Sequence, residues 1–188
     1  MKKSLCLILV AGVLVCGGAS MKKPKLSEQG QETKLEAFEK QTGTVIITGR
    51  SDIGKVSAMG SVSVVCIEII DVSTDQRRLG IVFEVKGSGT YEREDNSFVD
   101  YDEIESLLNG IDYVSKVTPS STKLSRFEAT YKTKGELSIA TFNSISGKFE
   151  AAVSSGSIGA ASAYMSKAKL SELRSIIAKA KEKLDEIK

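Results

Sequence analysis

The stretch that decides the fold is residues 78–86, RLGIVFEVK. Every second side chain along it is large and apolar, and the residues between them are mostly polar or small. The apolar set comprises Leu79, Ile81, Phe83 and Val85. This period of two is typical of a half-buried strand in an antiparallel sheet. The β-branched run at residues 62–72 predicts a partner strand, joined to the first by a hairpin loop at residues 73–77.

The spacing changes to that of a helix in two places. Residues 100–117, DYDEIESLLNGIDYVSKV, place their apolar side chains on one face at helical intervals, and Pro119 follows the predicted helix. Ser166 is a suitable N-cap for a second amphipathic helix that runs to the C-terminus. The sequence therefore predicts one mid-chain helix and one C-terminal helix.

Shorter β-branched or alternating runs predict the remaining strands. They lie at residues 44–49, from Tyr91 onward, and at 127–131, 137–143, 149–153 and 158–165. No strand–helix–strand rhythm suggests a parallel sheet. We therefore expect an α+β fold, with an antiparallel, strongly twisted or partly barrel-like sheet of about seven to eight strands and two amphipathic helices.

The N-terminus has the three parts of a secretory signal. Lys2 and Lys3 precede an uninterrupted apolar run at residues 5–15, and small residues follow at 17–20. The apolar run is shorter than the roughly 20 residues that span a bilayer. We expect an export signal at residues 1–19 and cleavage before Ser20. A polar tether with a short helix at 35–42 would fill residues 20–43, and a single globular domain would fill residues 44–188.

Two alternatives for the N-terminus stay open. Cys16 followed by two glycines resembles a bacterial lipidation site, although Val15 stands where a small residue is preferred. Translation from Met21 would instead leave the protein in the cytoplasm. The expected location is periplasmic or extracellular, with a membrane-anchored lipoprotein as the variant that Cys16 would create.

Charge and composition exclude several kinds of chemistry. Residues 1–19 carry two of the 26 basic side chains and none of the 24 acidic ones, so the exported chain would be formally neutral. That balance disfavours nucleic-acid binding. The chain has no histidine, which excludes histidine-dependent catalysis and histidine-ligated metals. Cys66 is the one cysteine downstream of the signal, and its β-branched neighbours indicate a buried, unreactive thiol.

Residues 49–55, GRSDIGK, match the first seven positions of a phosphate-binding loop. The next position requires Ser or Thr to hold magnesium, but it is Val56, and no helical pattern follows. We therefore expect a hairpin loop at these residues and no nucleotide.

Two weak constellations remain. Ser166 and Lys169 have the spacing of a serine–lysine nucleophile pair at a helix start, although an N-cap and a surface lysine explain them equally. Residues 92–112 hold eight acids and one base, and their oxygens offer candidate calcium ligands. The calcium candidates are Asp95, Asp100, Asp102 and Glu103. A solvated, acid-rich helix start is the alternative.

Two features suggest contacts rather than chemistry. Lysines border the apolar stripe of the C-terminal helix, which favours packing on a sheet over binding to a membrane or partner. Residues 156–163, GSIGAASA, have little side-chain bulk, so they would pack tightly beneath that helix or admit another backbone or a ligand.

Taken together, the sequence favours a non-enzymatic exported binding or interaction module without a cofactor. It would act on an unidentified protein or small-molecule ligand through a sheet face, a barrel mouth or a helix–sheet groove. The alternatives are a cell-envelope lipoprotein or assembly component, and a hydrolase that works without histidine. Contact with a membrane is expected only through lipidation.

Overall fold

The computed structural model describes residues 31–88, 93–144, 148–157 and 159–188. Within these residues, eight strands form two four-stranded antiparallel sheets, and three α-helices accompany them. The predicted α+β class and the mid-chain and C-terminal helices are confirmed. The strands divide between two sheets and do not close into a barrel. The predicted export signal and Cys16 lie outside the described residues.

The first sheet is an antiparallel meander of four strands. They are β1 (Ile46–Ala58), β2 (Gly60–Asp71), β3 (Gln76–Lys86) and β4 (Glu94–Asp100), adjacent in that order. The alternation that predicted β3 continues across to β2, because Ile81 and Phe83 stand opposite Cys66 and Val64 on the same buried face. The hairpin predicted at residues 73–77 is present between β2 and β3, with its turn at residues 72–75, because β3 already begins at Gln76.

The loop predicted at residues 49–55 is wrong, because these residues lie inside β1. They pair with β2 from Gly49 opposite Glu68 to Lys55 opposite Ser63, with a shift of register between Asp52 and Gly54. A bulge at a sheet edge accommodates glycine and polar residues without ending the strand.

The second half of the chain repeats the plan of a meander followed by a helix. After β4, a 3₁₀ turn at Tyr101–Glu103 leads into α2 (Ile104–Lys116), and a second 3₁₀ turn lies at Pro119–Ser121. The second sheet contains β5 (Glu128–Lys132), β6 (Leu137–Asn143), β7 (Phe149–Ser155) and β8 (Ala161–Met165), in that order. The helix α3 (Lys167–Ile187) follows β8.

The two sheets meet where the β1–β2 turn reaches β8. Met59 and Tyr164 exchange two backbone hydrogen bonds, of 3.1 and 2.9 Å. A Cβ at Gly60 would come within 3.2 Å of Ala163, so the small residues of β8 admit another backbone. Packing beneath the C-terminal helix and close approach of another backbone were both expected for this segment, and the β1–β2 turn provides such a backbone. The buried hydroxyls of Ser97 and Ser155 form a second link, at 2.7 Å, between β4 and β7.

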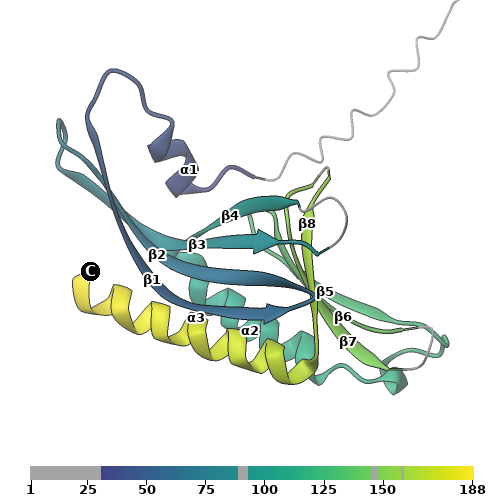
Figure 1. Cartoon of the computed structure of the whole chain (residues 1–188). Coiled ribbons are helices and arrows are strands. Elements are labelled where there is room, and N and C mark those ends of the chain that lie inside the picture. The colour runs from purple at the N-terminus through teal and green to yellow at the C-terminus, as the bar shows by residue number, and fades with distance from the viewer. Residues whose placement is uncertain (1–30, 89–92, 145–147, 158) are drawn as a thin grey trace, which may run out of the picture.

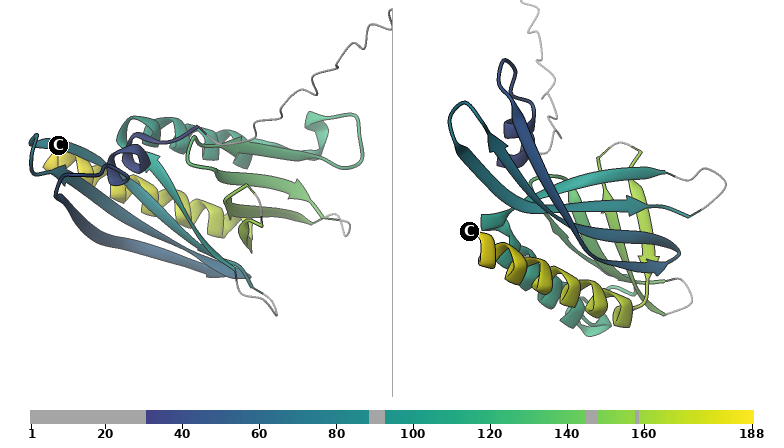
Figure 2. Two further views of the ribbon diagram at one scale, coloured as in Figure 1. Left: turned by 90° about the horizontal axis from the view of Figure 1, so that it is seen from above. Right: turned by 60° about the vertical axis from the view of Figure 1, so that its left-hand side comes forward.

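Helices cover both faces of the first sheet. Figure 1 shows α2 and α3 side by side below it, and a short helix, α1 (Lys34–Glu39), above it. The right-hand view of Figure 2 shows the same separation from another direction. The main hydrophobic core lies on the side of α3 and includes Leu170, Leu173 and Ile177. A smaller cluster on the opposite face joins Leu35 and Phe38 of α1 to β2 and β3.

The helix α1 is the short helix predicted within the tether, and it docks on the sheet. Thr33 caps it in a reciprocal capping box with Glu36. Leu35 is fully buried and Phe38 is 4% exposed. The folded unit therefore includes residues that the sequence placed in the tether.

Candidate ligand-binding site

Ser166 and Lys169 do not form a nucleophile pair in this geometry. The Ser166 hydroxyl oxygen accepts a hydrogen bond from the Lys169 backbone N–H and caps α3. The Lys169 ammonium donates to Glu172 at 2.7 Å. Both residues line a shallow cavity of about 460 Å³ beside Met59 and Tyr164. The arrangement matches an N-cap with a surface ion pair.

The four acidic candidates have separate partners. Asp95 is exposed and accepts from the neighbouring Asn96 N–H, and Asp102 pairs with the Lys34 ammonium. Glu103 accepts through Oε1 from the Lys134 N–H at 3.0 Å, and burial raises the pKa of this carboxyl. Its other oxygen, Oε2, is buried and has no partner within the described residues. No group of three or more acids or cysteines in the described part of the chain is placed to hold a metal ion.

Asp100 has the most specific role of the four. It is 2% exposed, and its two carboxylate oxygens accept from the backbone N–H groups of Lys34 and Leu35 at 2.9 and 3.0 Å. These N–H groups lie in the first turn of α1, where no carbonyl within the helix can reach them. Asp100 thereby fixes α1 against the end of β4.

In the described part of the chain, the end of β4 leaves part of β3 without a strand neighbour on one side. The two strands pair from Lys86 opposite Glu94 to Gly80 opposite Asp100. The pairing of β3 with β2 continues four residues further, to Gln76 opposite Asp71. Beyond Asp100 the chain turns into the 3₁₀ turn, so residues 76–79 form an open edge of the sheet.

A cavity of about 720 Å³ occupies this place beside β3. The helix α1 forms one wall, and the residues that follow β4 form another. The complete lining is Lys34, Ala37, Phe38, Gln41, Gln76, Arg77, Arg78, Leu79, Asp100, Tyr101, Asp102 and Lys188. Its volume is in the range of sites that bind small organic ligands or a short peptide.

The lining carries four cationic side chains against two carboxylates. Lys34 pairs with Asp102, and the ion pair raises the pKa of Lys34 and lowers that of Asp102. Arg77 pairs with Glu68. The two carboxylates are already engaged, since Asp102 faces Lys34 and Asp100 accepts from α1.

Arg78 is the cation best placed to meet a ligand. Its guanidinium lies 5.2 Å from the centre of the Phe38 ring and donates to the Arg77 carbonyl oxygen at 2.9 Å. Within the described residues no carboxylate forms an ion pair with Arg78. Its other terminal nitrogen donates to the Gln76 side-chain oxygen at 3.4 Å. Each terminal nitrogen carries two N–H groups, so the guanidinium can still donate to a ligand.

Apolar surfaces lie beside these charges. Phe38 belongs to the hydrophobic cluster beneath α1, whereas Leu79 and Tyr101 pack against the main core. The Lys188 ammonium lies 4.4 Å from the centre of the Tyr101 ring. The cavity therefore combines apolar walls with an excess of positive side chains.

This cavity was missed in the sequence because its parts are distant along the chain. Residues 34–41, 76–79, 100–102 and 188 come together only in the fold. One signal was present: two consecutive arginines, Arg77 and Arg78, at the start of a strong strand. Adjacent residues of a strand point to opposite faces, so one of the two must lie on the face that the main core leaves free.

The remaining expectations concern α3 and Cys66. The helix packs on β1 and β2, as predicted, and Arg174 donates to both carboxylate oxygens of Asp112 in α2 at 2.6 and 2.7 Å. Cys66 is a buried free thiol, as predicted, and burial raises its pKa to about 11.

Comparison with known proteins gives no further guide to this site. No family model matches the chain, and neither a curated protein nor a solved structure is similar to it.

Proposed function

We propose that this protein is a non-enzymatic binding module that takes a negatively charged ligand in the cavity beside residues 76–79 of β3. The proposal rests on the surroundings of the Arg78 guanidinium. Its guanidinium lines a cavity of about 720 Å³, lies 5.2 Å from the centre of the Phe38 ring, and has no carboxylate partner among the described residues. A guanidinium in this state favours a carboxylate, sulfonate or phosphate group.

The other polar groups of the cavity also favour a negatively charged ligand. Both oxygens of Asp100 accept backbone N–H groups of α1, and Asp102 pairs with Lys34. The apolar walls at Phe38 and Tyr101 favour a ligand that also has an apolar part. The absence of histidine and the separate partners of Ser166 and Lys169 favour binding over catalysis.

Export of this module is also a proposal. It is supported by the charged, apolar and small-residue segments in residues 1–20. Within the described residues, no helix combines the length and hydropathy needed to cross a membrane. The denatured mass of the protein from its own host tests the proposal, since a start at Ser20, an acylated Cys16 and a start at Met21 differ in mass.

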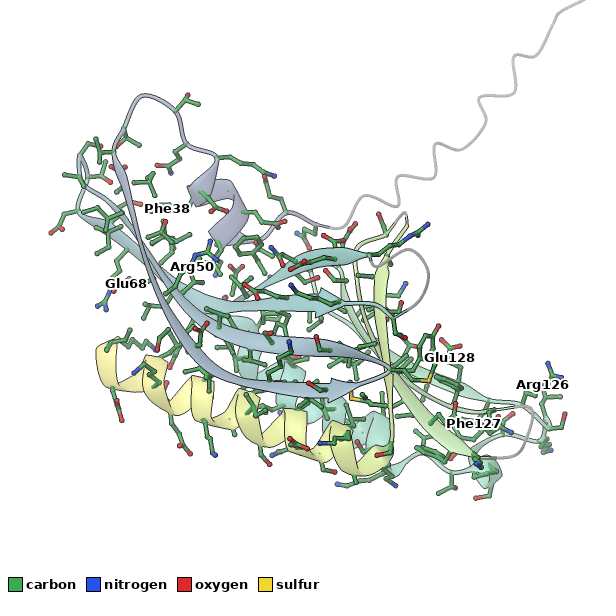
Figure 3. The ribbon with its side chains drawn as sticks, viewed as in Figure 1. Phe38, Arg50, Glu68, Arg126, Phe127 and Glu128 are labelled. Carbon is green, nitrogen blue, oxygen red and sulfur yellow. The ribbon has the colours of Figure 1, made fainter. Side chains whose placement is uncertain are left out.

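A matched pair of dyes tests the binding site. Anilinonaphthalene sulfonate and N-phenyl-1-naphthylamine share an aromatic skeleton, and only the first carries a negative sulfonate. We expect the sulfonate to bind at least about tenfold more tightly, because Arg78 donates to it. Arg78→Gln should abolish this preference. Arg126→Gln is the matched control, since Arg126 is exposed and lies at the far end of the molecule from Phe38 (Figure 3).

A second pair of variants locates the dyes in the cavity. Ala37 is an exposed residue of α1 that lines the cavity, so Ala37→Trp should block both dyes without disturbing the core. Ala168→Trp places the same side chain on an exposed position of α3, near the opposite end of that helix from Lys188. If Ala37→Trp binds the dyes as the unmodified protein does, the cavity is not the site and the proposal fails.

A further inference from the structure

The cavity lies along the backbone edge of β3 and not above one face of the strand. Four consecutive residues, Gln76, Arg77, Arg78 and Leu79, all line it. A cavity over one face of a strand would be lined by every second residue, because side chains alternate between the two faces. A lining by consecutive residues therefore means that the backbone edge itself borders the cavity.

Among the residues that the structure describes, this edge has no hydrogen-bonding neighbour. The last pair between β3 and β4 is Gly80 opposite Asp100. Within the described residues, β2 is the one segment whose backbone pairs with residues 76–79. An open edge of this kind presents backbone N–H and C=O groups that another extended chain can pair with.

The two sides of the edge differ in chemistry. Arg78 shares its face of the sheet with Phe38, and the Lys34 ammonium lies in the same cavity. Leu79 is on the opposite face together with Arg77, which pairs with Glu68, and there Leu79 and Tyr101 pack against the main core. A strand laid along this edge would direct alternate side chains toward the arginine and toward the apolar pair.

We infer that the ligand is an extended peptide segment that continues the line of β4 and pairs with residues 76–79 of β3. Its alternate residues are acidic and apolar. The acidic side chains meet Arg78 and Lys34, and the apolar ones lie against Leu79 and Tyr101. Addition of a strand derives affinity from the backbone and specificity from alternate side chains. This inference rests on the proposed function, because it assigns a ligand class to the same cavity.

Three modified peptides test the pairing by calorimetric titration against the full chain. The parent is acetyl-Val-Glu-Val-Glu-Val-amide. One isomer carries N-methyl groups on the second and third valines, and the other carries them on the two glutamates. In an extended strand, the N–H groups of successive residues point to opposite edges. The valine N–H groups therefore face one edge and the glutamate N–H groups face the other, and only one of these two sets can face β3. We expect one isomer to bind at least about tenfold more weakly and the other to bind like the parent.

The third peptide has glutamine in place of glutamate and should bind more weakly to the unmodified protein. The parent peptide should also bind more weakly to Arg78→Gln.

The outcomes separate this inference from the proposed function. Equal binding of both N-methyl isomers and the parent would overturn strand addition, while a dependence on Arg78 would leave the anion site in place. Binding of the anionic dye without binding of any peptide would likewise overturn strand addition and leave the anion site in place. Failure of both dye and peptide to bind would overturn both. Hydrogen exchange provides an independent measure, since the parent peptide should slow exchange at those amides of residues 76–79 that point away from β2 and leave the amides of β5 unchanged.

Discussion

Oδ1 of Asp100 accepts a hydrogen bond of 3.0 Å from the backbone N–H of Leu35, 65 positions earlier in the chain. The same carboxylate caps the preceding N–H through Oδ2. The contact joins the end of β4 to the start of α1, and these two elements form two walls of the cavity. Asp100 therefore adds a polar anchor to the apolar packing that holds α1 on the sheet.

Replacement of Asp100 by alanine should loosen α1. Two N–H groups of its first turn would lose their acceptor, which costs about 1–2 kcal/mol. We expect faster hydrogen exchange at residues 35–39 and a lower midpoint of urea unfolding. Asp95→Ala is the control, because Asp95 is exposed and accepts from its neighbour Asn96. Equal exchange rates in α1 for the two variants would contradict this role for Asp100.

Gly80 lies where α1 packs on the sheet, and its lack of a side chain lets Leu35 come close to β3. A Cβ at this position would overlap the Val99 carbonyl oxygen and come within 2.5 Å of Leu35 Cδ1. We therefore expect Gly80→Ala to reduce the free energy of unfolding by about 1–3 kcal/mol, as overpacking does elsewhere. Thermal or urea unfolding measures the change.

Gly49→Ala is the matched control for Gly80→Ala. Gly49 also lies in a strand of the first sheet, but a Cβ there would meet its nearest neighbour, Glu68, at an ordinary 3.6 Å. We expect Gly49→Ala to change the free energy of unfolding by less than about 0.5 kcal/mol. Similar losses for both variants would mean that the close contact with Leu35 does not decide the result.

The sequence identified those elements whose signal is local. The alternation in residues 78–86 predicted β3, and the apolar stripes predicted α2 and α3. Each of these patterns reflects burial of one face against a core, and burial repeats with the period of the element. The α+β class follows from the same patterns.

Features set by distant contacts were not predictable in the same way. The bulge in β1 made residues 49–55 resemble a loop, since a register shift admits glycine and polar side chains inside a strand. The acids of residues 92–112 looked like one group, yet Asp100 binds α1 and Glu103 binds the Lys134 amide. Their partners are 65 and 31 positions away, and nothing in their spacing identifies those partners.

The cavity was unpredictable for a related reason. It depends on β4 ending opposite Gly80 while β3 continues to Gln76. The sequence shows where a strand is favoured, but strand ends are its least certain feature. Two arginines at the start of β3 were the one local sign of this site.

Cys66 should resist alkylation until the protein unfolds. Its thiol lies in the core, donates to the Ala180 carbonyl oxygen at 3.4 Å, and has its pKa raised to about 11 by burial. The thiolate is the reactive form, so labelling by iodoacetamide at pH 8 should be at least about 100-fold slower in the folded protein than in guanidinium. Peptide mass mapping identifies label at Cys66, and Cys66→Ala is the control. Equal rates in both states would show that the site opens readily.

The ion pair between Asp112 and Arg174 should give stability a specific dependence on pH. The hydrogen-bonded guanidinium of Arg174 lowers the pKa of the Asp112 carboxyl in the folded protein. A lowered pKa means that the pair contributes its full stability above the ordinary carboxyl value of about 3.9, and that the contribution is lost as pH falls below it. The two side chains are 37% and 38% exposed, so the contribution should not exceed about 1 kcal/mol.

Urea unfolding of the unmodified protein and Asp112→Asn across a range of pH measures this contribution. The difference between the two should be constant from about pH 5 to pH 8 and should shrink below about pH 4. Arg174→Lys keeps the charge but loses the planar, two-point contact, so it should retain only part of the effect. A difference that persists unchanged at pH 2 would show that Asp112 acts through packing between α2 and α3, because a protonated carboxyl no longer forms the ion pair.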